Sequence, residues 1–349
     1  MTASVVRALG RVAREAAHAA HAAHPTRSTH VPAPSRARDQ DVTVLADRAD
    51  ATVVRYGDVV AKAHADGTDL TAHRTRLAVA AHPRLAGILL PPLPTNAGDV
   101  AGRPVTAWPY GAPVDPADPD SAPWEQAGTL IARLHAVPPD ALTDTLTAAL
   151  ADVTGGARPV TGGLPAARGP AKAARALARL RAAGPHPAAA PVRRAWERLP
   201  AWARGDAPPP GPYALCHGDL HLGQLVRHPA PDGPWLLIDV DDLGLGDPAW
   251  DLARPAAWYA AGLLPAEPWR RFLGAYRRAH GPAVPADPTA DPWPRLDVAA
   301  RALTVQTAAL AVAKSVAEDR EPDEVEVLMI DACARIAGLA TELEPGASP

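Results

Sequence analysis

One stretch of forty residues decides the fold: ALCHGDLHLGQLVRHPAPDGPWLLIDVDDLGLGDPAWDLA, residues 214–253. It opens on a short apolar run that has the character of a buried strand. That run leads directly into His217-Gly218-Asp219-Leu220-His221, so we expect Asp219 to lie on the loop that leaves the strand. A carboxylate on such a loop can accept the proton of a hydroxyl group.

A predicted hairpin follows this loop. Two strand-like runs, at 224–227 and 235–239, flank the sequence Pro-Ala-Pro-Asp-Gly-Pro at 229–234, a composition typical of a turn. Folding about the turn places Gln224 opposite Asp239, and we expect both to lie next to the loop of Asp219. A carboxylate paired with an amide oxygen is a suitable pair of ligands for Mg²⁺, which prefers oxygen.

The remainder of the stretch predicts a helix start. Asp247-Pro248 combines an N-cap residue with proline at the first helical position. Asp251 lies one turn into that helix, where its side chain can turn back toward the loop that bears Asp219.

In these motifs the chain resembles the aminoglycoside phosphotransferase family, a group of small-molecule kinases in the protein-kinase-like superfamily. The family pattern is H-G-D-x-x-x-x-N, followed after a spacer by I-D-(W/F)-x-x-x-x-x-G-D-P-x-x-D-L-A. The matches at 217–219 and 238–253 keep the spacing of the pattern, and the resemblance covers roughly residues 42–340.

The resemblance implies a role for each matching residue. Asp219 is expected to be the catalytic base or the residue that orients the hydroxyl, and Asp239 to bind Mg²⁺ on the phosphates of ATP or GTP. His217, Asp247 and Asp251 are expected to be structural supports. Residues 128–135, GTLIARLH, look like the family's L-x-x-L-H helix.

In the expected small lobe, Lys62 in the apolar run Val-Val-Ala-Lys-Ala resembles the strand lysine that contacts nucleotide phosphates. A lysine in such a strand needs a partner, because burial of an unpaired ammonium is costly. The helix glutamate that pairs with this lysine in the family is not evident: His73 occupies the expected position, and the nearby acid is Asp69. An edge-strand lysine that faces solvent is the alternative.

Two other positions depart from the family pattern. The asparagine expected as second magnesium ligand is Gln224, as in sugar kinases that resemble maltokinase. The loop at 47–50, Asp-Arg-Ala-Asp, has no glycine, so its backbone amides are poorly suited to wrap over phosphates. Arg48 is a candidate phosphate contact there, and a solvated turn arginine is the alternative.

The order of elements predicts an α+β protein with a two-lobe, protein-kinase-like fold. The predicted divisions are an N-terminal arm and linker at 1–40, a small antiparallel β lobe at 41–108, a hinge at 109–113, and a helical lobe with the catalytic hairpin at 114–349. The strands are expected at 42–46, 52–56, 59–63, 88–90 and 104–108. The helices are expected at 1–24, 70–81, 124–136, 139–153, 171–183, 190–203, 248–261, 268–280, 296–317 and 323–343.

Composition excludes several classes of partner. The formal net charge is −3, so no basic surface predicts nucleic acid or an anionic membrane as a partner. No apolar run approaches the length of a membrane span, and Cys216 and Cys333 are too few for a disulfide framework. Residues 1–24 predict an Ala-rich helix that bears arginines and lacks a secretory cleavage site; a loose arm and a transit peptide are the two interpretations. The simplest location is the cytoplasm.

The predicted function is transfer of a γ-phosphoryl group from a magnesium-bound nucleotide to a hydroxyl of an aminoglycoside, sugar or amino alcohol. The alternative is a nucleotide-binding pseudokinase or regulatory module with little transfer, favoured by Gln224, His73 and the glycine-poor loop. The oligomeric state and the acceptor are left open by the sequence.

Overall fold

The computed structural model describes most of the chain and divides into two compact units. The described residues are 2–23, 42–48, 50–95, 98–142, 163–211 and 213–339. The first unit is built from residues 1–122, 140–165 and 223–241, and the second from 123–139, 166–222 and 242–349.

The first unit contains a five-stranded antiparallel sheet with the order β1-β2-β3-β5-β4. Its strands are β1 (Val42–Asp47), β2 (Thr52–Tyr56), β3 (Val59–Ala63), β4 (Asp99–Val100) and β5 (Arg103–Pro109). The four strands predicted between residues 42 and 63 and at 104–108 are confirmed, and the fifth, predicted at 88–90, is a single bridge from Leu89 to Leu237. Gly57 takes a φ of 57° in the tight turn between β2 and β3, a conformation that favours glycine.

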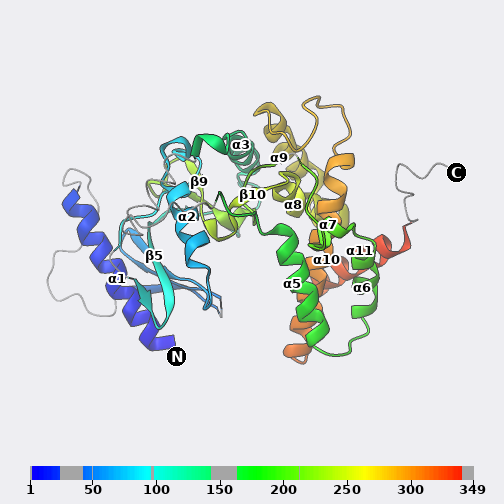
Figure 1. Ribbon diagram of the computed structural model, residues 1–349, viewed down its shortest axis with the longest axis horizontal. Helices are drawn as coiled ribbons and strands as arrows, with labels where there is room; N and C mark the ends of the chain where they lie inside the picture. Colours follow the sequence, from blue (N-terminus) through cyan, green and yellow to red (C-terminus); the bar gives the residue numbers. More distant parts are fainter. Residues whose placement is uncertain are drawn as a thin grey trace. The chain divides into compact units, whose positions relative to one another are not determined.

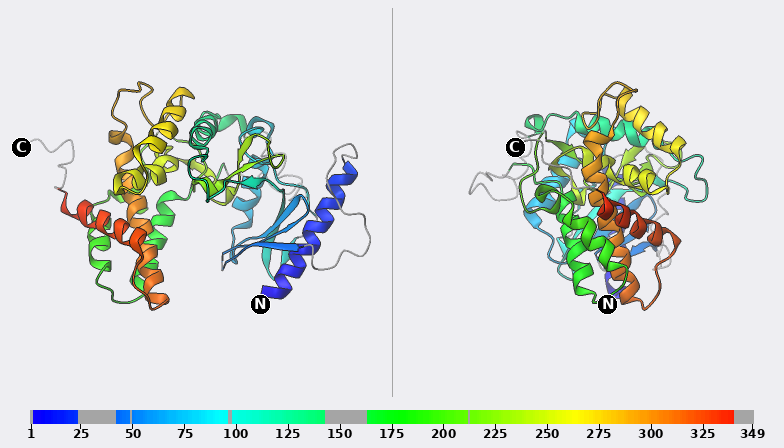
Figure 2. Two further views of the ribbon diagram at one scale, coloured as in Figure 1. Left: turned by 180° about the vertical axis from the view of Figure 1, so that it is seen from behind. Right: turned by 90° about the vertical axis from the view of Figure 1, so that its right-hand side faces the viewer.

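Helix α1 (Thr2–Ala23) packs against one face of this sheet (Figures 1 and 2). Leu9 is fully buried there, in a cluster that includes Val54 and Ala61. Because side chains alternate along a strand, Val53 and Lys62 face the opposite side of the sheet. The loose arm expected at 1–24 is therefore a structural helix, and the linker expected at 25–40 lies outside the described residues.

A second sheet in the first unit carries the hairpin predicted from the sequence. Its order is β6-β8-β9, with β6 (Ala112–Pro113), β8 (Leu225–Arg227) and β9 (Trp235–Leu237). Leu225 pairs with Leu237, as folding about the 229–234 turn requires. The prediction that 109–113 is a plain hinge, with the hairpin in the helical lobe, differs from the structure, because β6 pairs with β8 and groups the hairpin with the first unit.

Helix α2 (Leu70–Ala80) also belongs to the first unit. Asp69 is its N-cap and accepts hydrogen bonds from the backbone N–H groups of Thr71 and Ala72. The described residues also include the short 3₁₀ helices η2 (Pro83–Leu85), η3 (Leu222–Gln224) and η4 (Val240–Asp242).

The second unit is mainly helical. Its helices are α3 (Trp124–His135), α5 (Gly169–Ala182), α6 (Ala189–Glu197), α7 (Ala201–Arg204), α8 (Ala249–Ala261), α9 (Ala266–Arg278), α10 (Trp293–Ala317) and α11 (Glu324–Gly338). One small antiparallel ladder, β7 (Ala214–Cys216) with β10 (Gly244–Gly246), lies among them. The helix predicted at 190–203 is two helices, because Pro200 interrupts it, and most of the helix predicted at 139–153 lies outside the described residues.

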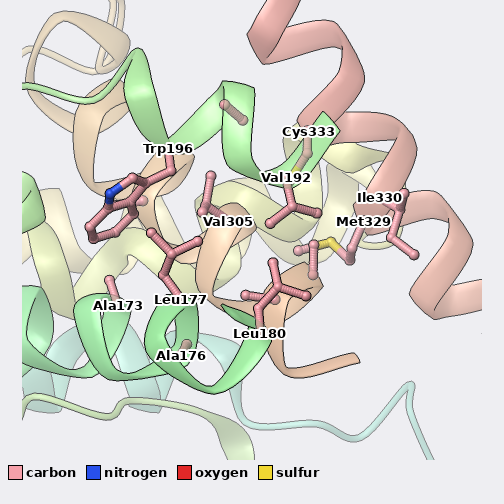
Figure 3. Close-up of a cluster of buried hydrophobic side chains, with 14 of the residues drawn as sticks. Ala173, Ala176, Leu177, Leu180, Val192, Trp196, Val305, Met329, Ile330 and Cys333 are labelled. Atoms are coloured by element: carbon pink, nitrogen blue, oxygen red, sulfur yellow. The ribbon is translucent and has the colours of Figure 1, made fainter. Parts of the chain in front are cut away.

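Figure 3 shows the core where α5, α6, α10 and α11 meet. Leu177 and Leu180 of α5 pack there with Val192, Val305 and Met329 from the other three helices. The stretch Trp293–Glu318, which contains α10, is long and apolar enough to cross a membrane, contrary to the expectation from the sequence. However, 67% of its apolar window is buried inside the protein, as expected for the central helix of a packed core.

Candidate active site

Two carboxylates hold the ammonium group of Lys62 in the first unit. The Nζ atom lies 2.8 Å from Oδ1 of Asp239 and 2.9 Å from Oδ2 of Asp241. Burial by itself would lower the pKa of Lys62, but the negative charges of the two carboxylates outweigh burial and raise that pKa. Lys62 is therefore a permanently charged group on the sheet face opposite helix α1. The alternative, an edge-strand lysine that faces solvent, is wrong.

Asp241 is itself held by a chain of hydrogen bonds. Nδ1 of His64 lies 3.1 Å from Oδ2 of Asp241, and Nε2 of His64 lies 2.8 Å from the hydroxyl of Thr106. The indole N–H of Trp108 donates to the same hydroxyl at 2.9 Å. Since a carboxylate only accepts, Nδ1 of His64 carries a proton and donates it to Asp241.

Helix α2 supplies no acidic partner to Lys62. The carboxylate of Asp69 is occupied in capping the helix. His73 is buried, and its ring centroid lies 4.3 Å from that of His64 in an edge-on contact. Burial, helped by the nearby His64, lowers the pKa of His73 to about 4, so this imidazole is neutral at physiological pH. Asp241 therefore takes the place of the helix glutamate.

Gln224 and Asp239 meet at the end of the hairpin, although the register places Ile238, and not Asp239 as predicted, opposite Gln224. The side-chain amide nitrogen of Gln224 donates to Oδ2 of Asp239 over 3.4 Å. The backbone N–H of Ile238 donates to the backbone carbonyl of Gln224. Asp239 has a φ of 63°, a left-handed conformation that costs a non-glycine residue about 1–3 kcal/mol. Such strain is typical of functional sites, and the carboxylate and amide oxygens fit the ligand preference of Mg²⁺.

A cavity of about 440 Å³ opens beside these groups within the first unit. Lys62, His64, Asp239 and Asp241 lie at its polar end. Its other walls are mainly apolar and include Val53, Val60, Leu90, Trp108, Val226 and Ile238. An apolar slot that ends in a cation and carboxylates suits a ligand with a flat apolar part and an anionic tail.

The β1–β2 hairpin borders the cavity through Leu45 and Ala46. A β-bulge between Val44 and Ala46 shifts the register there, so that the adjacent residues Leu45 and Ala46 both reach the cavity. The hairpin is closed by a bond from the N–H of Arg48 to the carbonyl of Ala51 at 2.8 Å. Phosphate contact by Arg48 stays a prediction.

Asp219 lies in the second unit, where two cations bind the same carboxylate oxygen. Its Oδ1 accepts from Lys172 at 2.9 Å and from Arg254 at 2.7 Å. Burial would raise the pKa of Asp219, but the charges of Lys172 and Arg254 lower it to about 2. Within the described chain no hydrogen bond reaches Oδ2, so that oxygen is available to an acceptor hydroxyl.

Asp251 supports the loop that carries Asp219. It is fully buried, and its two oxygens accept the backbone N–H groups of His217 at 2.6 Å and Gly218 at 2.7 Å. His135, at the end of the predicted L-x-x-L-H helix, lies 3.0 Å from Asp251 and 2.8 Å from the hydroxyl of Tyr276. The predicted return of Asp251 toward this loop is confirmed.

Close packing against the backbone of Asp242 also fixes the loop that carries Asp219. Gly218 has a φ of 84°, and a Cβ atom there would lie 2.4 Å from the backbone oxygen of Asp242. Asp247 accepts from the backbone N–H of Ala249 at 3.0 Å, but the N-cap residue of α8 is Pro248, one position later than predicted. His217, Asp247 and Asp251 thus lie where supporting residues are needed.

Four residues of these clusters had no role assigned from the sequence: His64, Asp241, Lys172 and Arg254. The acidic run Asp-Val-Asp-Asp at 239–242 and the scarcity of lysine before residue 300 were the available signals for Asp241 and Lys172. For His64 and Arg254 the sequence holds no comparable signal, since their contacts join segments far apart in the chain.

A strand lysine paired with carboxylates in a sheet-based unit, and an H-G-D loop in a helical unit, are the parts of a protein-kinase-like phosphotransferase. The sequence model of the phosphotransferase enzyme family matches residues 41–293. The chain therefore belongs to this family, and the family resemblance is confirmed. A search of curated proteins finds no match.

Solved structures of family members share this fold. The chain is similar to a thermostable mutant of aminoglycoside phosphotransferase APH(4)-Ia in a ternary complex with ADP and hygromycin B, at 13% identity and a TM-score of 0.55, with 86% of this chain and 95% of that chain covered. It is also similar to spectinomycin phosphotransferase APH(9)-Ia in complex with ADP and spectinomycin, at 12% identity, a TM-score of 0.52 and coverage of 85% and 92%. At these identities the likeness establishes the fold.

Proposed function

We propose that this protein transfers the γ-phosphoryl group of ATP or GTP to a hydroxyl group of a small molecule. The observation that carries the proposal is the pairing of Lys62 with Asp239 at the polar end of the 440 Å³ cavity. The apolar walls suit a nucleobase, and the ammonium suits its phosphates. The complexes of two family members with ADP support a nucleotide as co-substrate.

Each group of the first unit has a defined role in this proposal. Lys62 neutralises phosphate charge, and Asp241 with His64 keeps the ammonium in position. Asp239 and Gln224 would hold Mg²⁺, which when bound stabilises charge on the phosphates. Asp239 contacts both Lys62 and Gln224, so it links the cation to the magnesium ligands.

Asp219 acts on the acceptor. Its free Oδ2 accepts a hydrogen bond from the acceptor hydroxyl and fixes the attacking lone pair. As the bond from that oxygen to phosphorus forms and the bond from phosphorus to the nucleoside diphosphate breaks, the hydroxyl proton passes to Asp219. Because the pKa of Asp219 is about 2, this proton transfer comes late, after the hydroxyl has become acidic.

The direct test is Asp219→Asn, assayed for phosphoryl transfer to a panel of sugars, aminoglycosides, amino alcohols and hydroxy acids with MgATP and MgGTP. We expect a loss of about 10²–10⁴-fold in kcat, since one general base is removed. Nucleotide affinity, measured by calorimetry, is expected to stay within about twofold, which corresponds to a change in binding free energy of less than about 0.5 kcal/mol. Full transfer by the Asn variant would refute the role of Asp219.

A second candidate function is a nucleotide-binding regulatory module with little transfer. It is favoured by Gln224 in place of asparagine and by the absence of a glutamate in α2, within the described residues. Tight MgATP binding without transfer to any acceptor of the panel is the result expected for this alternative. Transfer that depends on Asp219 would exclude it.

A further inference from the structure

Two buried histidines and a carboxylate of the first unit lie within reach of a single ion. They are His64, which follows β3, His73 of α2 and Asp241 of η4, and we call them the His-His-Asp cluster. One ligand atom from each, an imidazole nitrogen or a carboxylate oxygen, lies within 4.8 Å of the other two. Two imidazoles with a carboxylate suit Zn²⁺, whereas Mg²⁺ prefers oxygen ligands.

The distances within the cluster are close to those of a zinc site. Nδ1 of His64 lies 3.1 Å from Oδ2 of Asp241. Around a tetrahedral Zn²⁺ with bonds of about 2.1 Å, neighbouring ligand atoms are about 3.4 Å apart. His64 and Asp241 are therefore already spaced to share an ion, and the ligand atom of His73 needs to approach them by no more than about 1.4 Å.

His73 is available as a ligand. Its side chain is buried beside His64, and in the described part of the chain its ring makes no hydrogen bond. The low pKa of His73, about 4, leaves the imidazole neutral, and a metal binds the neutral ring through a nitrogen lone pair. Binding an ion therefore requires neither deprotonation of His73 nor loss of a hydrogen bond.

His64 is supported from its other side, as metal-binding histidines usually are. Nε2 lies 2.8 Å from the hydroxyl of Thr106, so this nitrogen can carry a proton and donate it to that oxygen when Nδ1 gives up its own to bind an ion. His64 and Asp241 also line the cavity of about 440 Å³. An ion can enter through that cavity and keep a water molecule as its fourth ligand.

Lys62 competes for the same carboxylate oxygen. Its ammonium lies 2.9 Å from Oδ2 of Asp241, the atom that His64 also contacts. A divalent cation bound to this oxygen repels the ammonium at short range, so the ion and Lys62 exclude each other there. Lys62 then keeps Asp239, at 2.8 Å, and loses Asp241.

We propose that His64, His73 and Asp241 form a Zn²⁺ site, and that its occupation weakens nucleotide binding by taking Asp241 away from Lys62. The metal site stands on the geometry of the cluster, whereas the inhibition rests on the proposed function. Because the two binding events are linked, MgATP is expected to lower Zn²⁺ affinity by the same factor by which Zn²⁺ lowers MgATP affinity.

The first test is calorimetric titration of Zn²⁺ into metal-free protein that carries His18→Gln and His21→Gln. These substitutions remove two exposed histidines of α1 that lie three positions apart and can bind the ion themselves. We expect His73→Gln to weaken Zn²⁺ binding by about 100-fold or more, because loss of an outer-shell partner alone costs about 10–100-fold. Equal affinity with and without His73 overturns the site.

His82→Gln is the matched control. His82 is also a buried histidine of the first unit, and it lies outside the cluster, where it caps η2. We expect this variant to bind Zn²⁺ with unchanged affinity, and an equal loss in both variants counts against the inference. Thermal unfolding without metal distinguishes loss of a ligand from loss of folding, and His73→Leu is titrated as well, so that one folded variant suffices.

The second test measures MgATP affinity with and without an equivalent of Zn²⁺. We expect Zn²⁺ to lower the affinity by about 10–100-fold when His73 is present, because Lys62 loses a charge-assisted hydrogen bond, and to change it little in His73→Gln. Zn²⁺ bound by the nucleotide itself affects both proteins equally, so their difference reports on the site.

The two tests separate failure of this inference from failure of the proposed function. Zn²⁺ that binds through His73 and leaves MgATP affinity unchanged overturns the inhibition while the metal site stands. If MgATP does not bind at all, the proposed function fails and the inhibition fails with it. The titration with Zn²⁺ alone then still establishes or refutes the metal site.

Discussion

Lys62 pairs with Asp241, which lies on the same segment as Asp239, the candidate magnesium ligand. In the proposed function Asp239 holds Mg²⁺, whereas Asp241 is bonded by Lys62 and His64 through a single oxygen. With Asp239 engaged by a metal, Asp241 would still hold the ammonium. The positioning function usually given to a helix glutamate would then be performed by a residue two positions after the proposed metal ligand.

This arrangement predicts the effect of Asp241→Asn. Loss of the charge removes a charge-assisted hydrogen bond to Lys62, so we expect MgATP affinity to fall about 10–100-fold. The thermal transition and the affinity are measured together, because a general loss of folding lowers both. An unchanged affinity contradicts the assigned role.

A rescue variant makes the test specific. His73 lies on α2 beside His64, and the charge of Lys62 contributes to lowering its pKa, so His73 is within electrostatic reach of the ammonium. We expect His73→Glu to restore MgATP affinity to Asp241→Asn, because it returns the acid to the helix. Arg74→Glu places the same charge on the neighbouring, exposed position and is expected to restore nothing.

The pKa of Asp219 predicts the pH dependence of transfer. Burial opposes ionisation, yet Lys172 and Arg254 hold the pKa at about 2, so the reactive carboxylate form persists above about pH 3. We expect kcat/KM for the acceptor to show no acidic limb from Asp219 between pH 5 and 8. Lys172→Met removes one of the two cations and is expected to raise the pKa; an acidic limb already present in the unmodified protein near pH 5 contradicts the assignment.

At the level of elements, the local sequence pattern predicted the strands and turns whose formation depends on neighbouring residues. Strands β2 and β3 alternate apolar residues on either side of Tyr-Gly-Asp, and they have the predicted bounds. The Pro-rich turn at 229–234 determined how the hairpin pairs. Helix ends were predicted less well, as at Pro200, where the proline ends one helix and precedes the next.

The contacts that hold the charged groups could not be predicted in the same way. His64 and Asp241 are 177 positions apart, and Lys172 and Asp242 are 70 apart. No periodicity or turn signal relates such segments, because their approach is determined by the packing of whole elements. The candidate site was therefore predictable in its motif residues and unpredictable in the partners of those residues.

Helices α3 and α9 pack closely enough to give a stability prediction. A Cβ atom on Gly128 of α3 would lie 2.3 Å from the backbone oxygen of Phe272 in α9. We expect Gly128→Ala to destabilise the protein by about 1–3 kcal/mol, because the backbones must separate. Thermal or denaturant unfolding measures the change.

Gly274→Ala on α9 is the matched control. There the nearest atom to an added Cβ is the flexible end of Arg278, at 3.3 Å. We expect this variant to be neutral or to stabilise by up to about 1 kcal/mol, since alanine is the better helix former. Equal destabilisation by both variants contradicts the assigned packing.

Across the whole molecule, residues that are close in sequence belong to different units. The chain changes unit between Leu222 and Gly223 and again between Asp241 and Asp242. Asp219 therefore belongs to one unit, and Gln224 and Asp239 to the other. A short segment therefore carries residues for both proposed tasks, nucleotide binding and acceptor activation.

Helix α1 has a practical consequence for how the protein is handled. The family match begins at residue 41, but the helix that covers Val54, Tyr56 and Ala61 ends at residue 23. A protein trimmed to the family boundary exposes this apolar sheet face to water. We expect it to self-associate and precipitate, as measured by light scattering and soluble yield.

Single substitutions test the same point without removing the helix. Leu9→Asp on the buried face of α1 is expected to lower the soluble yield, whereas Arg11→Asp on the exposed face is not. Equal yields contradict the covering role. We therefore expect helix α1, which lies outside the family boundary, to keep the protein soluble by covering the apolar face of the sheet.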